Sequence, residues 1–250
     1  MSTEETKDNF KNGIFWELYL DLERQFKNFL EYVPYLNGNE DVYSFRLLNL
    51  TLSIGGHVDS AFKEMAQYPK FSENDDCNKI LQKVKENEEN IREGKRPIPV
   101  PIWLSLRAFE REYKLSTRKV MFKRLPEREN IQPFKPHNAK TKAPEWWEIY
   151  NGLKHYVSVN IRKANLQNTL HALAGAFLLN AVHNPSVLRL FKYGVFKIEF
   201  EPNVYGGIYS RQIASPEWVQ QEYEERGTLP AHLETPLFIY DYGEWDEDYE

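Results

Sequence analysis

The stretch FKNGIFWELYLDLERQFKNFLEYV (residues 10–33) indicates the fold class, because its large apolar side chains recur at steps of three and four residues. That repeat is typical of one face of an α-helix. Apolar residues from 47 to 65 repeat the pattern, and a proline and the turn residues Asn37-Gly38-Asn39 separate the two stretches. The sequence therefore predicts two successive amphipathic helices, the second with Asn39 as its N-cap.

The second predicted helix contains the pair Gly55-Gly56. Glycine inside a helix costs about 1 kcal/mol relative to alanine, so a pair needs a compensating reason. We expect close packing against another helix.

The rest of the chain is predicted to be mixed. Prolines and glycines divide it into segments of helical and of alternating apolar pattern. The segment around 120–122 fits either a short strand or a helix. Ser72 and Asp75 form a capping-box-like start to a third helix, which ends at Gly94. The sequence also predicts helices over 144–155 and 162–183, strands over 195–201 and 237–240, and a long loop over 126–144. This gives a mainly α bundle over 1–190, a small β-containing extension over 191–240 and an acidic tail over 241–250.

Composition and charge limit the classes of function. The 250 residues carry a net charge of −5 and one cysteine, Cys77, which has no partner for an internal disulfide. No apolar run reaches the roughly 18 residues of a membrane span, so we expect a cytoplasmic protein without a membrane partner. Residues 111–142 hold ten Lys and Arg against three acids. This basic segment fits either a path for a phosphate backbone, through Lys135, Lys140 and Lys142, or a solvated face.

The segment PEWWEIYNGLKH (residues 144–155) is the best candidate for a site. The sequence has no phosphate-binding glycine loop, and one cysteine excludes a cysteine-based zinc site. On a helix, Trp147, Asn151 and Lys154 or His155 share one face, and Asn151 and His155 lie one turn apart. An imidazole can transfer a proton at neutral pH, and a lysine can stabilise phosphorane charge. Alternatively, Trp147 is a core residue and Lys154-His155 complement the helix C-terminus.

This segment, followed by KANLQNTLHALAGAFLLN (residues 163–180), resembles a group of uncharacterised bacterial proteins with the signature P-x-W-W-x-x-Y-N-x-x-K-H. That group in turn is similar to the HEPN superfamily, antiparallel helical bundles of prokaryotic toxin–antitoxin, abortive-infection and CRISPR systems. The resemblance covers about residues 10–184. HEPN ribonucleases use an R-x4–6-H motif, without metal, often at a homodimer interface. His155 matches the motif histidine and Asn151 its polar position, whereas Tyr150 stands where the arginine would be.

The resemblance implies a HEPN-like RNA-binding protein that acts as a metal-independent endoribonuclease in a defence or toxin–antitoxin system. His155, Asn151 and Lys154 would be catalytic, with Lys154 or Arg162 supplying the missing positive charge. No cofactor or metal is expected, and the partners would be RNA, a second copy of the chain and an antitoxin or defence protein. The alternative is a non-catalytic module for dimerisation or partner binding. The residues predicted to bind nucleic acid are Trp147, Tyr150, Arg162, Lys135, Lys140 and Lys142.

Overall fold

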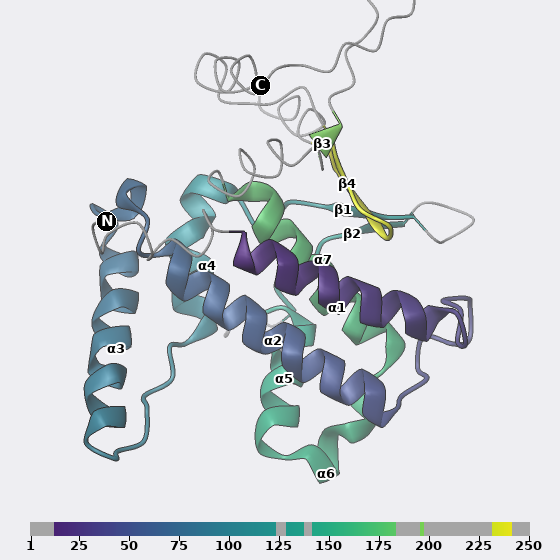
Figure 1. Ribbon diagram of the computed structural model, residues 1–250, viewed down its shortest axis with the longest axis horizontal. Helices are drawn as coiled ribbons and strands as arrows, with labels where there is room; N and C mark the ends of the chain where they lie inside the picture. Colours follow the sequence, from purple (N-terminus) through teal and green to yellow (C-terminus); the bar gives the residue numbers. More distant parts are fainter. Residues whose placement is uncertain (1–12, 124–128, 138–141, 184–195, 198–231, 242–250) are drawn as a thin grey trace, which may run out of the picture.

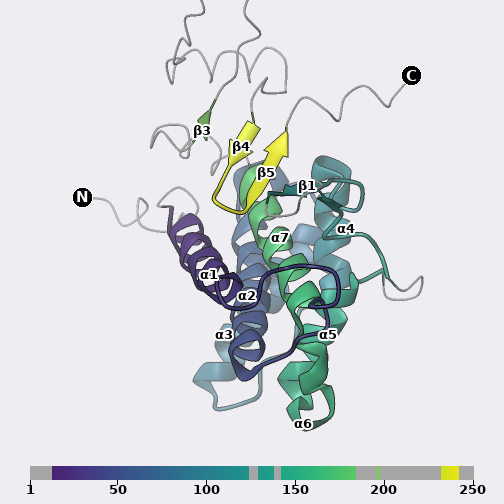
Figure 2. The same ribbon diagram turned by 90° about the vertical axis from the view of Figure 1, so that its right-hand side faces the viewer.

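The computed structural model describes residues 13–123, 129–137, 142–183, 196–197 and 232–241. Within these ranges the chain is mainly α, with seven α-helices and a small antiparallel sheet above one side of them (Figures 1 and 2). No helix in these ranges is both long and apolar enough to cross a membrane. The helices are α1 (Ile14–Leu30), α2 (Phe45–Met65), α3 (Asp75–Arg92), α4 (Ile102–Tyr113), α5 (Glu145–His155), α6 (Val157–Asn160) and α7 (Leu166–Val182).

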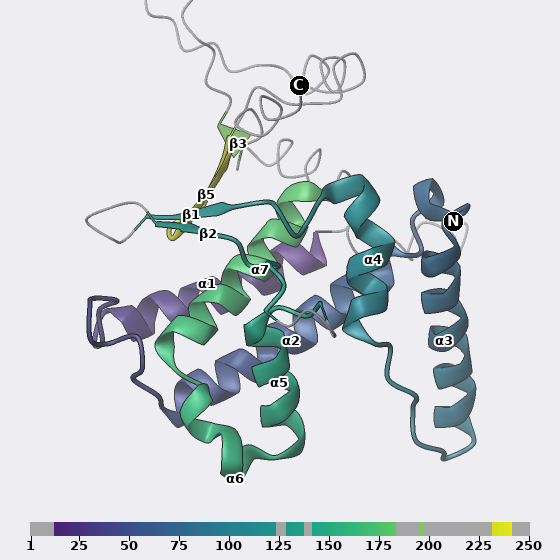
Figure 3. The same ribbon diagram turned by 180° about the vertical axis from the view of Figure 1, so that it is seen from behind.

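Helix α2 is the centre of the bundle. It packs against α1, α5 and α7, while α3 and α4 form a pair at one side (Figures 1 and 3). The chain turns back after α1, so α1 and α2 run antiparallel as neighbours (Figure 1). The apolar stripe predicted for α2 is confirmed, because all of its members are buried: Leu47, Leu50, Ile54, Val58, Ala61 and Met65.

The start of α2 differs from the prediction. Ser44 is the N-cap, and its Oγ accepts a hydrogen bond from the backbone N–H of Leu47 at 3.1 Å. The predicted cap, Asn39, instead donates its side-chain amide to the carbonyl of Pro34 at 3.0 Å. Tyr43 forms a β-bridge with Asn165, so the backbone is still extended there and the helix can begin only after it.

The two glycines of α2 differ in their surroundings. A Cβ on Gly55 would overlap the ring of Tyr150, closer than the 3.0 Å that real Cβ atoms keep, whereas a Cβ on Gly56 would meet nothing within 4 Å. The predicted close approach is therefore confirmed for Gly55 alone, and it sets α5 directly against α2.

The sheet has the order β2-β1-β5-β4-β3, and every neighbouring pair is antiparallel. The predicted loop over 126–144 was wrong in part, because β2 lies within it. Residues 120–122 form a strand, which resolves the open choice there. The strands are β1 (Val120–Phe122), β2 (Glu129–Ile131), β3 (Phe196–Lys197), β4 (His232–Glu234) and β5 (Phe238–Asp241).

The sheet connects the basic segment to the C-terminal strands. Met121 on β1 pairs with Ile239 on β5, and the rings of Phe122 and Phe238 lie 5.8 Å apart. Phe238 also stacks on Phe177 of α7, at 5.5 Å, so the sheet shares the core of the bundle. The predicted boundary near residue 190, most of the strand predicted over 195–201 and residues 242–250 of the predicted acidic tail lie outside the described residues.

Helix α1 carries a buried carboxylate toward this sheet. Leu18, one of the apolar residues that recur in the stretch over 10–33, is 50% exposed, whereas Glu23 is 1% exposed. Glu23 accepts hydrogen bonds from the Thr235 hydroxyl at 2.5 Å and from the backbone N–H of Leu237 at 3.0 Å. Burial raises the pKa of Glu23, and the hydrogen bonds from Thr235 and Leu237 oppose that rise. Glu23 thus ties α1 to the turn between β4 and β5.

The helix predicted over 162–183 is shorter than expected. The chain passes through α6 and a 3₁₀ turn, Ile161–Lys163, before α7 begins at Leu166. Asn165 is the N-cap of α7, because its side chain accepts from the N–H of Asn168 at 2.9 Å. The C-terminal end of α5 is therefore followed by a compact turn that places it at the surface.

Candidate functional site

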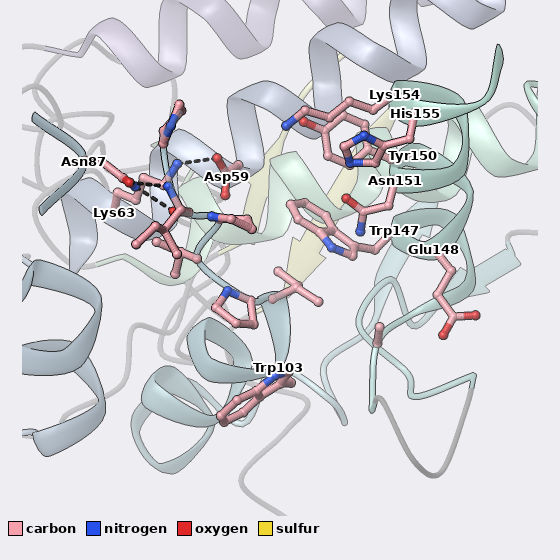
Figure 4. A pocket seen from close by; sticks show the side chains of 17 residues that line it. Asp59, Lys63, Asn87, Trp103, Trp147, Glu148, Tyr150, Asn151, Lys154 and His155 are labelled. Atoms are coloured by element: carbon pink, nitrogen blue, oxygen red, sulfur yellow. Dashed lines mark hydrogen bonds and ion pairs between the residues drawn. The ribbon is translucent and has the colours of Figure 1, made fainter. Parts of the chain in front are cut away.

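A cleft of about 620 Å³ lies between α5, α2 and the segment that leads from α3 to α4 (Figure 4). One wall is α5, the opposite wall is the polar side of α2, and the proline-rich residues 97–102 close it. The residues that line it are Asp59, Lys63, Asn87, Pro97, Ile98, Pro99, Val100, Pro101, Ile102, Trp103, Ala143, Trp147, Glu148, Tyr150, Asn151, Lys154 and His155. The face of α5 that carries Asn151 and His155 thus borders this cleft.

The α5 wall is held in place by aromatic packing. The buried Trp146 donates its indole N–H to the carbonyl of Pro133 at 2.6 Å. Trp147 and Tyr150 lie 5.0 Å apart between ring centres, and the Tyr150 ring rests on Gly55. Trp147 and Tyr150 are only 4% and 6% exposed. Only a small part of each side chain is therefore open to the cleft, and the larger part belongs to the core.

Three polar side chains of α5, which the sequence places on one helix face, line the cleft. Asn151 is half-buried, while Lys154 and His155 are exposed in the last turn of the helix. Figure 4 shows the three on the same wall, with the Lys154 side chain extended beside Tyr150. Within the described part of the chain, the Asn151 amide has no hydrogen-bond partner. The site therefore offers an amide, an ammonium and an imidazole to a bound group.

Lys154 places a positive charge beside the ring of Tyr150. The ammonium of Lys154 lies 5.7 Å from the centre of the Tyr150 ring, a cation–π distance. Burial, and secondarily the charge of Asp59, raise the pKa of Tyr150, so its phenol is neutral at physiological pH and keeps its O–H. Of the two cations expected to replace the arginine, Lys154 lies at the cleft.

The α2 wall contributes an ion pair that the sequence analysis missed. Asp59 and Lys63 are one helical turn apart, and the Lys63 ammonium contacts the Asp59 carboxylate. Both side chains are about 30% exposed, at 29% and 31%. The only sequence signal was their four-residue spacing on the polar side of α2, which is common to many solvated helices.

The proline-rich wall is fixed by a side chain of α3. The Asn87 amide donates to the carbonyl of Ile98 at 2.7 Å, and its oxygen accepts the Ile98 N–H, so both backbone groups of Ile98 are satisfied. Trp103, at the end of this wall, is 46% exposed, with the guanidinium of Arg107 at 5.0 Å from its ring. In the sequence this wall shows only as three alternating prolines, Pro97, Pro99 and Pro101.

The remaining predicted nucleic-acid contacts lie apart from the cleft lining. Arg162 is on the turn before α7, 6.0 Å from the Tyr43 ring. Lys135 and Lys142 are exposed, and Lys142 directly precedes Ala143, which does line the cleft. Lys140 lies outside the described residues. The structure therefore brings together the α5 residues and leaves the basic side chains as candidates for more distant contacts.

A preformed metal centre is not seen in the described ranges, where no group of three or more His, Cys, Asp or Glu side chains is gathered. The cleft carboxylates there are Asp59, which pairs with Lys63, and Glu148, which points away from the cavity (Figure 4). No protein-family model, curated protein or solved structure matches this chain. Any functional proposal therefore rests on the geometry of the cleft.

Proposed function

We propose that this chain is a HEPN-like RNA-binding protein whose RNA site is the cleft between α2 and α5. The observation that supports it is the convergence of Asn151, Lys154 and His155 on one wall of that cleft. An ammonium can hold a phosphate, and an amide can bond a phosphate oxygen or a ribose hydroxyl. Sequence-specific proteins bind RNA mostly where the strand is single and its bases are splayed out. The cleft suits such a strand because its lining combines the polar side chains of α5 with the aromatic residues Trp147 and Tyr150.

The proposed activity is cleavage of the bound strand without metal. The imidazole of His155 takes the proton of a 2′-hydroxyl, and the resulting oxygen attacks the neighbouring phosphorus. The bond from phosphorus to the 5′-oxygen breaks, giving a 2′,3′-cyclic phosphate and a 5′-hydroxyl end, the leaving oxygen taking a proton from water. Lys154 stabilises the charge of the phosphorane, and Asn151 orients the reacting group. Because His155 is exposed, its proton can exchange with solvent afterwards.

One observation favours the alternative, a HEPN-like module that binds without cleaving. At the position of the family arginine, Tyr150 is a buried packing residue, 6% exposed and fitted against Gly55. A side chain held in the core cannot swing toward a phosphate. Lys154 is then the only member of the α5 trio that carries a permanent positive charge.

A cleavage assay with matched variants tests the proposal. We expect purified protein to cut single-stranded RNA in the presence of EDTA, and His155→Ala to lower the rate by about 10²–10⁴-fold. Because His155 is exposed, that variant should keep its stability to within about 0.5 kcal/mol. His137→Ala, another exposed histidine, is the control and should cut normally. Equal cutting by all three proteins would indicate a contaminating nuclease and refute the catalytic role.

Binding is tested separately, so that a non-catalytic module is recognised. Lys154→Ala should weaken binding of the same RNA at every salt concentration, and Lys163→Ala, an exposed lysine outside the cleft lining, should weaken it less. Replacing Lys135, Lys140 and Lys142 together should flatten the fall in affinity between about 50 and 200 mM salt. RNA binding with no cutting supports the module. Absence of RNA binding refutes the proposed function.

The proposal includes a homodimer and a partner from a defence or toxin–antitoxin system. A two-fold contact at the end of α5 would present His155 of each copy near the same strand. Light scattering on the purified chain tests the dimer, since a monomer at the concentration of the cleavage assay would contradict it.

A further inference from the structure

The ion pair on α2 faces the cleft but has no part in the chemistry proposed for α5. Asp59 and Lys63 line the cavity opposite the α5 residues, and Figure 4 shows the Asp59 carboxylate on the side toward Tyr150. The Lys63 ammonium contacts Oδ2 of Asp59. In the described part of the structure, Oδ1 has no hydrogen-bond partner. A half-satisfied carboxylate in a cleft can accept further donors from a ligand.

The order of these polar atoms is specific. The ion pair offers three polar atoms in sequence. The first is the donor Nζ of Lys63, which contacts the acceptor Oδ2 of Asp59, and the third is the second carboxylate acceptor, Oδ1. The Watson–Crick edge of guanine presents, in the same order, the O6 acceptor, the N1–H donor and the 2-amino donor. The two rows complement each other at all three positions, with the carboxylate accepting two parallel N–H groups.

Other RNA bases satisfy this row less well. Adenine and cytosine each offer one amino donor next to a ring-nitrogen acceptor, which leaves one carboxylate oxygen without a partner. One carbonyl of uracil can accept from Lys63, and its ring N–H can donate to one carboxylate oxygen of Asp59. Its second carbonyl would then face the other oxygen of Asp59, and two acceptors cannot pair. A site built to hydrogen-bond one ligand discriminates against another ligand that leaves the polar groups of the site unpaired.

We propose that Asp59 and Lys63 read a guanine base of the bound RNA, which gives the cleft its base specificity. This inference rests on the proposed RNA function, and it assigns the base to the α2 wall and the phosphate to Lys154 on the α5 wall. A cleft of about 620 Å³ is within the roughly 300–1,000 Å³ of ligand sites, enough for one nucleotide. Asp59 and Lys63 are specificity residues, since they contact the base and not the reacting atoms.

Three short single-stranded RNAs test the inference with the full chain. They are uridine oligonucleotides that carry one guanosine, one inosine or one adenosine at the central position. Inosine keeps O6 and N1–H but lacks the 2-amino group, so only the contact to Asp59 Oδ1 is lost. By fluorescence anisotropy, we expect the guanosine oligonucleotide to bind about 10-fold or more tightly than the inosine one, because the lost hydrogen bond is to a charged group. The adenosine oligonucleotide should bind no better than the inosine one.

Asp59→Asn tests the same contact from the protein side. The amide replaces one acceptor with a donor, so the guanosine preference over inosine should fall to less than about 2-fold. The matched control is Glu88→Gln on α3, which breaks another pair at the same four-residue spacing, with Arg92, outside the cleft. That variant should keep the full preference. The comparison of oligonucleotides in the unchanged protein does not depend on how any variant folds.

The outcomes separate this inference from the function on which it rests. Equal affinity for the three oligonucleotides, with binding still sensitive to Lys154→Ala, would overturn guanine reading and leave RNA binding in the cleft. A guanosine preference that survives Asp59→Asn would also overturn it. Failure of all three oligonucleotides to bind would overturn both proposals.

Discussion

Alanine substitutions at Gly55 and Gly56 should change stability in opposite directions, although the two glycines are neighbours on α2. A Cβ at Gly55 would overlap the Tyr150 ring, and a Cβ at Gly56 has open space within 4 Å. Inside a helix, alanine is favoured over glycine by roughly 0.5–1 kcal/mol, and this gain is common to both variants. The difference between the variants is therefore the cost of moving Tyr150, about 1–3 kcal/mol for an overpacked core.

Urea unfolding of the wild type and both variants measures this difference. We expect Gly56→Ala to be more stable than the wild type by about 0.5–1 kcal/mol, and Gly55→Ala to be less stable than Gly56→Ala by about 1–3 kcal/mol. Adding Tyr150→Leu to Gly55→Ala should cost less than the sum of the two changes, because the overlap is removed. Equal stability of the two alanine variants would refute the close contact between α2 and α5.

Three further predictions concern buried or capping groups elsewhere. Since burial raises the pKa of Glu23, the folded state holds its proton to higher pH than the unfolded state, so stability should fall as pH rises above the ordinary value of 4.5. Unfolding curves from pH 4 to pH 8 should show a weaker fall for Glu23→Gln, and an identical fall would contradict the assignment. Burial raises the pKa of Cys77 to about 12 and the residue is fully covered, so a thiol reagent at about pH 8 should modify it only after unfolding. Asn74 caps α3 by accepting from the N–H groups of Asp76 and Cys77, so Asn74→Ala should cost about 0.5–2 kcal/mol in urea unfolding, against little change for the exposed Asn78→Ala.

The helices were the most predictable part of the fold, because their signal is local. The stripe of α2 follows a repeat that needs no knowledge of its neighbours. The cap at Ser44 was missed because the bridge between Tyr43 and Asn165 keeps the backbone extended past Asn39. Strand β2 was missed because three residues are too few to show alternation, and its neighbour β1 is paired on the other side by β5 from the far end of the chain.

The candidate site was predictable on one wall only. The α5 wall is a single continuous motif, so spacing placed Asn151 and His155 on one face. The α2 wall is reached through the tertiary contact of Gly55 with Tyr150, which no local pattern encodes. The proline-rich wall depends on the amide of Asn87, one of many polar residues on a solvated helix. A continuous motif can therefore indicate one wall of a cleft, whereas the residues of the opposite walls depend on tertiary contacts.

The order of the strands in the sequence means that the sheet can be completed only late in synthesis of the chain. Strands β1 and β2 come from residues 120–131, and β5, the other neighbour of β1, comes from residues 238–241. Until those later residues leave the ribosome, one edge of β1 has N–H and C=O groups without a strand partner, and Phe122 lacks Phe238. Unpaired edges of this kind invite association with other chains. The helices around α2 can form earlier, so the nascent protein passes through a stage in which its bundle is complete and its sheet is open.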